Sequence, residues 1–295
     1  MTQSKIDQKG KASFTHIYDQ ETPSDFYLKF APLSYIIADV ARSPSMLIYE
    51  HFMEIRSVPR ISILDVACSY GINAAIQRFH LSSSELQGRY AALPNTCDRL
   101  IEADRVFFSS RRPDERLSFI GQDIAHNAIS YAQKVGLLSE SICVDFERNT
   151  ELEPCQKAIL APIDIVLATG AVGYVTEKTL IPIVKASANS PWIVSFVLRQ
   201  IEYRPVEENL NQLGYVTEKL KQMVFPQRRF FDAEEKNAAV QKLNQMGKPL
   251  TPLEKRGWHA AELYLSRPVA DVQLPLSELI DSDVLSSVCR TSLPE

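Results

Sequence analysis

Short apolar runs alternate with helical patterns between residues 60 and 200 of this 295-residue chain. Apolar runs of about four to eight residues, bounded by turn residues, are typical of strands buried on both faces of a parallel sheet. We expect five such strands at 61–66, 117–122, 141–144, 163–168 and 192–198, and two later ones at 216–225 and 261–266. The pattern predicts an α/β fold with a doubly wound, mostly parallel seven-stranded sheet.

The helical patterns begin and end at capping residues. Ser82 followed by Glu85 forms a capping box at the start of a segment, 82–112, that holds two helical patterns. Gly136 closes the helix after the second strand, and Thr176 opens the one after the fourth. Other helices are expected at 72–79, 206–213 and 233–246.

The chain before the first strand has a different residue pattern. Residues 24–55 read as short helices broken by Pro32 and Pro44, and they are rich in aromatic residues. We interpret 1–55 as an N-terminal helical cap, 56–270 as the core with a helical insertion at 82–112, and 271–295 as a C-terminal tail.

Composition excludes several classes of protein. The 32 basic and 36 acidic residues give a net charge of −4, which argues against a nucleic-acid or anionic-membrane partner. The five cysteines are scattered without a C-x-x-C pair, so neither a disulfide framework nor a metal site is expected. The longest uncharged run has 13 residues, against about 20 for a membrane span. We expect a cytoplasmic protein.

Acidic residues follow three consecutive predicted strands. Asp65, Asp123 and Asp145 would meet at the carboxyl edge of the sheet, where doubly wound folds bind ligands. An acid after the second strand suits the hydroxyls of a ribose, and the small residues of 67–71 allow close approach to the backbone. Neither a P-loop nor a G-x-G-x-x-G fingerprint is present. The pattern therefore favours a ligand with ribose and adenine but no phosphate.

Four segments carry this pattern in order: LDVACSYGINA at 64–74, FIGQDI at 119–124, VDF at 144–146 and DIVLAT at 164–169. Together they resemble the motifs of the class I S-adenosylmethionine-dependent methyltransferases, which have a Rossmann-like fold. Two departures are Ala67 and Ser69, which stand where the family has glycines. Asp123 follows Asp65 by 58 residues, a longer gap than is usual, which the insertion explains.

The resemblance implies S-adenosylmethionine as the cofactor and methyl transfer as the reaction. The residues that match its cofactor motifs are Asp65, Ala67, Ser69, Gly71, Asn73, Asp123, Ile124, Asp145, Phe146 and Thr169. The reaction turns a sulfonium into a neutral thioether, so an electron-rich acceptor is favoured in a dry site. We expect a small-molecule acceptor that is methylated on oxygen, at a carboxylate or a hydroxyl.

Candidates for the acceptor side lie on both flanks of these motifs. Arginine matches the planar shape of a carboxylate. The resemblance also implies an N-terminal aromatic segment that closes the cofactor site, which the tyrosines ahead of the core would supply. The candidates are Tyr18, Tyr27, Tyr35, Arg199, Tyr203, Arg228 and Arg229. His126, just after the second strand, is the candidate general base, and His16 and His51 lie in the cap.

Other functions stay open at this stage. The acceptor can be a macromolecule, or the chain can be a methyltransferase-like binding protein without catalysis. A nicotinamide oxidoreductase is disfavoured by the missing glycine fingerprint. The helix in 98–110 forms either a lid or a dimer surface, so a homodimer is also among the expected partners.

Overall fold

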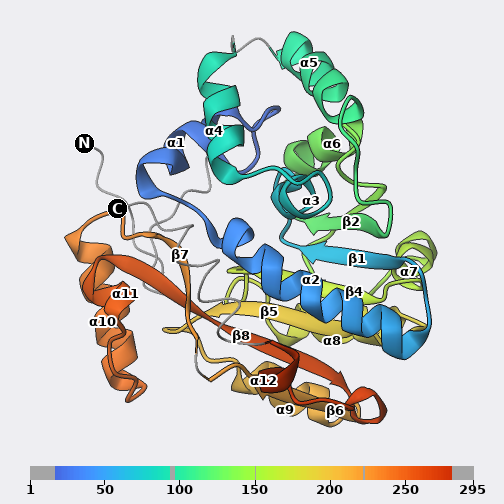
Figure 1. Cartoon of the computed structure of the whole chain (residues 1–295), viewed down its shortest axis with the longest axis vertical. Coiled ribbons are helices and arrows are strands. Elements are labelled where there is room, and N and C mark those ends of the chain that lie inside the picture. Colours follow the sequence, from blue (N-terminus) through green and yellow to red (C-terminus); the bar gives the residue numbers. More distant parts are fainter. Residues whose placement is uncertain (1–16, 94–96, 150, 222, 281–295) are drawn as a thin grey trace.

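The computed structural model describes residues 17–93, 97–149, 151–221 and 223–280, and its centre is a mixed eight-stranded sheet (Figure 1). The strands are β1 (Ile61–Val66), β2 (Leu117–Asp123), β3 (Glu140–Cys143), β4 (Ile165–Thr169), β5 (Trp192–Leu198), β6 (Tyr215–Lys219), β7 (Phe225–Arg229) and β8 (Trp258–Pro268). Their order is β3-β2-β1-β4-β5-β8-β6, with β7 also paired to β8. Strands β1 to β5 are parallel, and β8 runs antiparallel to β5, β6 and β7.

Helices cover both faces of this sheet. They are α1 (Ser24–Phe30), α2 (Ile37–Arg56), α3 (Ile72–Gln77), α4 (Ser83–Ala92), α5 (Cys97–Ser109), α6 (His126–Lys134), α7 (Pro154–Leu160), α8 (Glu177–Ala186), α9 (Arg204–Asn211), α10 (Ala233–Gln245), α11 (Pro252–Lys255) and α12 (Leu276–Leu279). Helices α2, α3 and α6 pack in one hydrophobic core, and α7, α8 and α9 in the other. Among the described helices, none combines the length and apolarity that a membrane crossing needs.

The strand order places the topological switch point between β1 and β4. From β1 the chain moves outward to β2 and β3, and then crosses back to β4 on the other side of β1. Crevices at the carboxyl ends of such a strand pair are the usual ligand sites of open α/β sheets. The fold therefore singles out the ends of β1 and β4.

The late strands differ from the sequence prediction. The strand expected at 216–225 is two strands, β6 and β7, so the sheet has eight strands rather than seven. Residues 220–224 separate them, and β7 then pairs with the first residues of β8. Pro226 lies inside β7 and weakens its strand signal, since proline gives no ladder N–H.

The expectation that Pro44 breaks the helical N-terminal region is also wrong. Pro44 lies inside α2, a continuous helix of 20 residues. A proline within a helix removes one backbone hydrogen bond and costs about 3 kcal/mol. The face of α2 that carries Ile37, Ala41, Ile48 and Phe52 is buried in the core, and this packing offsets the cost.

The segment between α3 and β2 contains two helices, α4 and α5, and a buried carboxylate joins them to α6. Ser82 and Glu85 form the predicted capping box of α4. Asp104 on α5 is fully buried and accepts hydrogen bonds from Arg89 Nε (2.8 Å) and from the Tyr90 and Tyr131 hydroxyls (3.1 and 2.7 Å). These bonds hold α4 and α5 against α6, which begins just after β2.

Gly121 in β2 has no room for a side chain. A Cβ there would lie 2.5 Å from Leu138 Cδ1 and 2.8 Å from Cys68 Sγ. We expect Gly121→Ala to lower the free energy of unfolding by about 1–3 kcal/mol, the usual cost of overpacking a core. Gly88→Ala is the matched control, because nothing lies within 4 Å of its Cβ and α4 should gain about 0.5–1 kcal/mol. Urea unfolding measures both, and equal changes would contradict this packing.

Candidate functional site

The ends of β1 and β4 are joined by one amide group. Asn73, in the first turn of α3, uses its Nδ2 to donate to Asp65 Oδ1 and to Thr169 Oγ1, both at 2.9 Å. Asp65 lies at the end of β1, and Thr169 is the last residue of β4. The sequence motifs predicted all three residues, and the structure brings them together at the switch point.

Asp65 is a buried acid with one unpaired carboxylate oxygen. Its exposure is 1%, and no described residue forms a hydrogen bond with its Oδ2 atom. Burial raises the pKa of Asp65 to about 7, the bond from Asn73 opposes that shift, and the nearby Asp123 charge adds to it. A buried carboxylate oxygen without a partner is costly unless a cation or a donor meets it.

The turn after β1 has left-handed backbone at three alternate positions. Ala67, Ser69 and Gly71 have φ values of 54°, 51° and 73°. Glycine adopts this conformation freely, whereas other L-residues are strained by about 1–2 kcal/mol each. The turn thus has left-handed backbone of the kind that glycine favours, although two of these three residues are not glycine. Strain of this kind concentrates at functional sites.

Asp123, at the end of β2, lies across from this turn. Its Oδ2 accepts from Ser69 N (2.7 Å) and its Oδ1 from Ala125 N (2.9 Å). Burial raises the pKa of Asp123, although these two N–H groups act in the opposite direction. Each carboxylate oxygen has a second lone pair, so both can still accept a hydroxyl. Ile124 next to it is 65% exposed, an apolar surface beside the acid.

The third acid is placed less deeply. Asp145 lies two residues beyond the end of β3, accepts from Glu147 N (3.1 Å) and pairs with the exposed Arg148 at 3.4 Å. Its neighbour Phe146 is 1% exposed and packs in the core with α7, α8 and α9. The cofactor contact predicted for Phe146 therefore has no exposed ring surface to carry it.

Glu147 connects two loops at this edge of the sheet, and the sequence pattern did not predict it. Its carboxylate accepts from Thr176 N (2.7 Å), Thr176 Oγ1 (2.9 Å) and Thr179 Oγ1 (2.6 Å). A carboxylate at the start of α8 is favoured by the helix dipole. Glu147 thereby ties the loop after β3 to the loop after β4. The sequence marks Thr176 as a helix N-cap, but it does not show that Thr176 bonds Glu147, which lies 29 residues earlier in the chain.

Residues 17–36, here called the strap, lie over the carboxyl edge of the sheet. The Tyr70 hydroxyl lies 3.2 and 3.1 Å from the carbonyl oxygens of Ile17 and Gln20, and it accepts from Gln20 N at 2.9 Å. Asp19 Oδ1 accepts from Asn127 N at the start of α6 (2.7 Å). The strap is thus held by the turn after β1 and by the helix after β2.

The strap tyrosines have different surroundings. Tyr18 and Tyr35 are half-buried and contact Phe26 and Phe30, with ring centroids 5.3–5.9 Å apart. Tyr27 instead stacks on Tyr90 of α4 at 4.6 Å, with an interplanar angle of 3°. Tyr27 therefore joins the strap to the insertion, while Tyr18 and Tyr35 stay near the strand ends.

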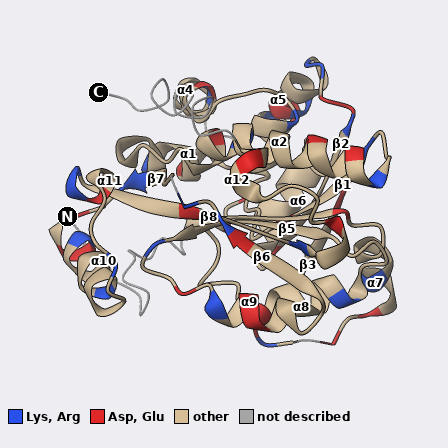
Figure 2. Cartoon of the chain, turned by 60° about the horizontal axis from the view of Figure 1, so that its bottom comes forward, with Lys and Arg blue, Asp and Glu red and all other residues tan. Residues whose placement is uncertain are grey.

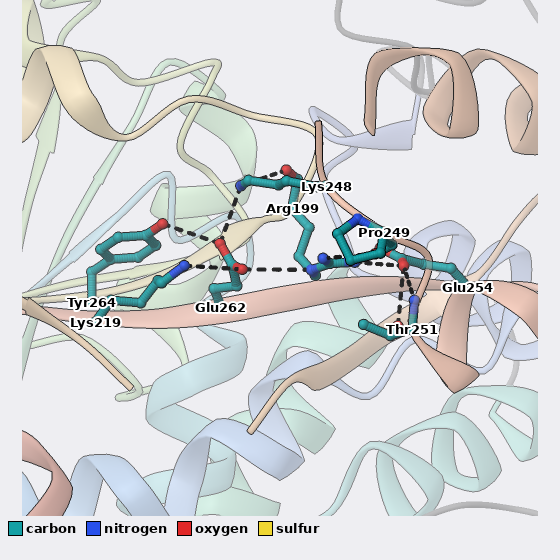
Figure 3. Close-up of polar contacts among 8 residues, drawn as sticks. All are labelled: Arg199, Lys219, Lys248, Pro249, Thr251, Glu254, Glu262 and Tyr264. Atoms are coloured by element: carbon teal, nitrogen blue, oxygen red, sulfur yellow. Dashed lines mark hydrogen bonds and ion pairs between the residues drawn. The ribbon is translucent and has the colours of Figure 1, made fainter. Parts of the chain in front are cut away.

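Arg199 and Tyr203, expected beside the acceptor, are used in packing. Arg199 Nη1 pairs with Glu254 at 2.6 Å and its Nε with Glu262 at 3.5 Å, within the network that Figure 3 shows. Tyr203 is 3% exposed, donates to Ser195 Oγ (3.2 Å) and packs against Tyr264 on the α9 side of the sheet. The structure does not bring either residue to Asp65.

The paired arginines of β7 also have partners. Arg228 is fully buried, and its Nη1 and Nη2 donate to Glu235 at 2.8 and 2.6 Å. Arg229 lies over the Trp258 ring, 5.0 Å from its centroid. Neither contact supports the prediction that this pair binds a substrate carboxylate.

The two candidate histidines that the structure describes are not gathered at the switch point. His126 is exposed in the first turn of α6, on the β2 side of the edge. The ring centroid of His51 on α2 lies 5.8 Å from that of Trp192. Trp192 is the first residue of β5, so His51 lies at the opposite edge of the sheet from the strand ends. His16 lies outside the described residues. The role of general base predicted for His126 stays a prediction.

A surface groove of about 730 Å³ lies elsewhere, on the insertion. Its lining residues on α4 and α5 include Arg89, Ala103, Val106 and Phe107. None of the strand-end acids lines it. We place the candidate site at the switch point instead, because buried polar atoms without partners gather there: Asp65 Oδ2, Ser69 Oγ and Asn73 Oδ1.

The arrangement is suited to a ligand with hydroxyls at one end and a cation at the other. Asp123 can accept hydroxyls, the turn 67–71 offers close approach, and Asp65 can meet a positive charge. The three orphaned buried atoms need a ligand or water, since unpaired polar groups are costly.

Neither a protein-family model nor a curated protein sequence matches the chain. Solved structures that match include a TehB-like SAM-dependent methyltransferase from Corynebacterium glutamicum, with 14% identity over 74% of this chain and 87% of that one and a TM-score of 0.36. Magnesium protoporphyrin IX methyltransferase from Synechocystis, solved with bound SAM, has 11% identity, coverages of 82% and 84%, and a TM-score of 0.39. The plantazolicin methyltransferase BamL, in complex with a triazolic desmethylPZN analog and SAH, has 14% identity, coverages of 85% and 97%, and a TM-score of 0.38. These TM-scores are low, so the function is argued from this chain's own residues.

The strained turn gives a direct prediction. Ala67→Gly should raise the free energy of unfolding by about 1 kcal/mol, because glycine adopts φ of 54° without strain. Ala91→Gly, on the exposed face of α4, is the control and should lower it by about 1 kcal/mol. Thermal unfolding of both variants measures the difference. Equal destabilisation would show that the turn is not left-handed at Ala67.

Proposed function

We propose that the chain is an S-adenosylmethionine-dependent methyltransferase that acts on the oxygen of a small-molecule acceptor. The observation that carries the proposal is the group of orphaned buried atoms, with Asp65 foremost, under a left-handed turn at the switch point. A dinucleotide or nucleoside triphosphate fits less well, because no glycine-rich phosphate loop is present.

The residues present fit this cofactor. Asp123 would accept the two ribose hydroxyls, and the exposed Ile124 would lie against the adenine. The backbone of 67–71 would approach the methionine part, with Asp65 and Asn73 supplying the free oxygens for its cationic groups. When bound, S-adenosylmethionine supplies an activated methyl group. The protein's own task is to position the acceptor and to exclude water.

The replaced glycines do not count against a working site. A non-catalytic descendant would be expected to relax the turn once close approach was no longer needed. Here Ala67 and Ser69 keep the left-handed backbone in spite of its strain. This observation favours the catalytic reading over a methyltransferase-like binding protein.

The N-terminal cap would serve to close the site. The strap is tied to the turn through Tyr70 and to α6 through Asp19. Such a cover favours a small acceptor over a folded macromolecule. Acidic and basic residues are interspersed over the surrounding helices and loops (Figure 2), and the net charge of −4 gives no basic footprint for nucleic acid.

Cofactor binding tests the proposal. Isothermal titration calorimetry should show S-adenosylmethionine binding to the wild type, and Asp123→Ala should weaken it by roughly 10- to 100-fold. Hydrogen bonds to a charged group contribute about 1.5–3 kcal/mol, which corresponds to that range. NADH, which needs a pyrophosphate loop, should not bind.

Glu140→Gln is the matched control for this titration. Glu140 is an exposed acid at the start of β3, on the opposite edge of the sheet, so its loss should leave the affinity unchanged. Absence of S-adenosylmethionine binding to the folded wild type would refute the function. Equal affinity of the wild type and the Asp123→Ala variant would refute the site.

A further inference from the structure

Strand β7 brings a buried glutamine to the end of β4. Gln227 is 1% exposed, and its side chain lies directly on Gly170, where a Cβ would be 2.1 Å from Gln227 Nε2. Gly170 follows Thr169, which shares the Asn73 amide with Asp65. A short series of contacts therefore leads from the cofactor acid across β4 to Gln227.

The carbonyl oxygen of this side chain has no hydrogen-bond partner among the residues that the structure describes. Gln227 Oε1 is buried, and its backbone oxygen is the atom that accepts from Ile36 N at 2.9 Å. An unmet buried acceptor costs about 1–3 kcal/mol. A donor from a ligand removes that cost.

Aromatic residues of the strap share this region. Tyr35 precedes Ile36, and its ring contacts Phe26 and Phe30. Burial raises the pKa of Tyr18 to about 12, while Arg228 lowers it and Asp123 raises it further. Charges from β7 and from the end of β2 thus both act on Tyr18. An acceptor beside Gln227 would meet aromatic surface.

The charges around Gln227 disfavour an anionic acceptor. Arg228 is the arginine next to Gln227, and both of its terminal nitrogens donate to Glu235. Asp65, which Asn73 links to Thr169 next to Gly170, adds negative charge when it ionises. A carboxylate would be repelled by that charge without gaining an unshared guanidinium.

We infer that Gln227 is the residue that selects the acceptor, by accepting a hydrogen bond from an O–H or N–H group of a neutral aromatic molecule. The inference rests on the proposed function and narrows it, since it favours a hydroxyl over a carboxylate. An amide oxygen is too weak a base to take the proton at neutral pH. Gln227 therefore binds and orients the acceptor and is not a general base.

Two probe molecules isolate this hydrogen bond. Phenol carries the donor, and anisole is the same ring with the donor blocked by a methyl group. Binding of each to protein saturated with S-adenosylhomocysteine is measured by ligand-observed NMR, for the wild type and for Gln227→Met. We expect the substitution to weaken phenol binding by roughly five- to tenfold, the equivalent of one buried hydrogen bond, and to leave anisole unchanged.

Controls separate a loss of structure from a loss of recognition. Gln77→Met removes another buried glutamine, one that accepts from Tyr49 in the core, and it should not affect phenol. Benzoate should bind the wild type at least tenfold more weakly than phenol. Equal weakening of phenol and anisole, tighter binding of benzoate, or no binding of phenol to the loaded protein would overturn the inference. Failure of S-adenosylhomocysteine itself to bind would instead overturn the proposed function, and this inference with it.

Discussion

The burial of the Asp65 carboxyl group at the end of the central strand is the constraint on which the site depends. Desolvation makes its charged form costly, and one amide group, that of Asn73, links it to Thr169 across the switch point. Replacement of Asp65 by an apolar residue would remove the desolvation cost, but it would also remove the hydrogen-bonded link between β1 and β4. A buried acid of this kind is expected where a ligand of opposite charge stabilises its ionised form.

The same constraint organises the parts around it. The turn 67–71 keeps left-handed backbone at two non-glycine residues, and one of them, Ser69, holds Asp123 through its N–H. Tyr70, the residue after Ser69, holds the strap through its hydroxyl group. Strain, acid placement and cover are therefore properties of one five-residue turn. A change of backbone there would alter all three.

The sequence allowed the strand-end acids and the capping box to be predicted, because both depend on local patterns. Asp65 and Asp123 follow apolar runs, and parallel strands end at one edge. The roles of Arg199 and Arg228 were not predictable in this way. Their partners, Glu254 and Glu235, lie 55 and 7 residues further on, and only the tertiary fold brings them together. Strand β7 was missed because Pro226 obscures its pattern, and Gln227 was missed with it.

We expect the buried carboxyl group of Asp65 to release a proton when a cationic ligand binds beside it. Calorimetry of S-adenosylmethionine binding at pH 6.5, in two buffers with different ionisation enthalpies, measures that proton. Burial raises the pKa of Asp65 to about 7, so part of the free wild type carries this proton at pH 6.5, and a bound cation lowers the pKa. We expect proton release by the wild type, and a smaller release by Asp65→Asn. Binding with the same proton count in both proteins would contradict it.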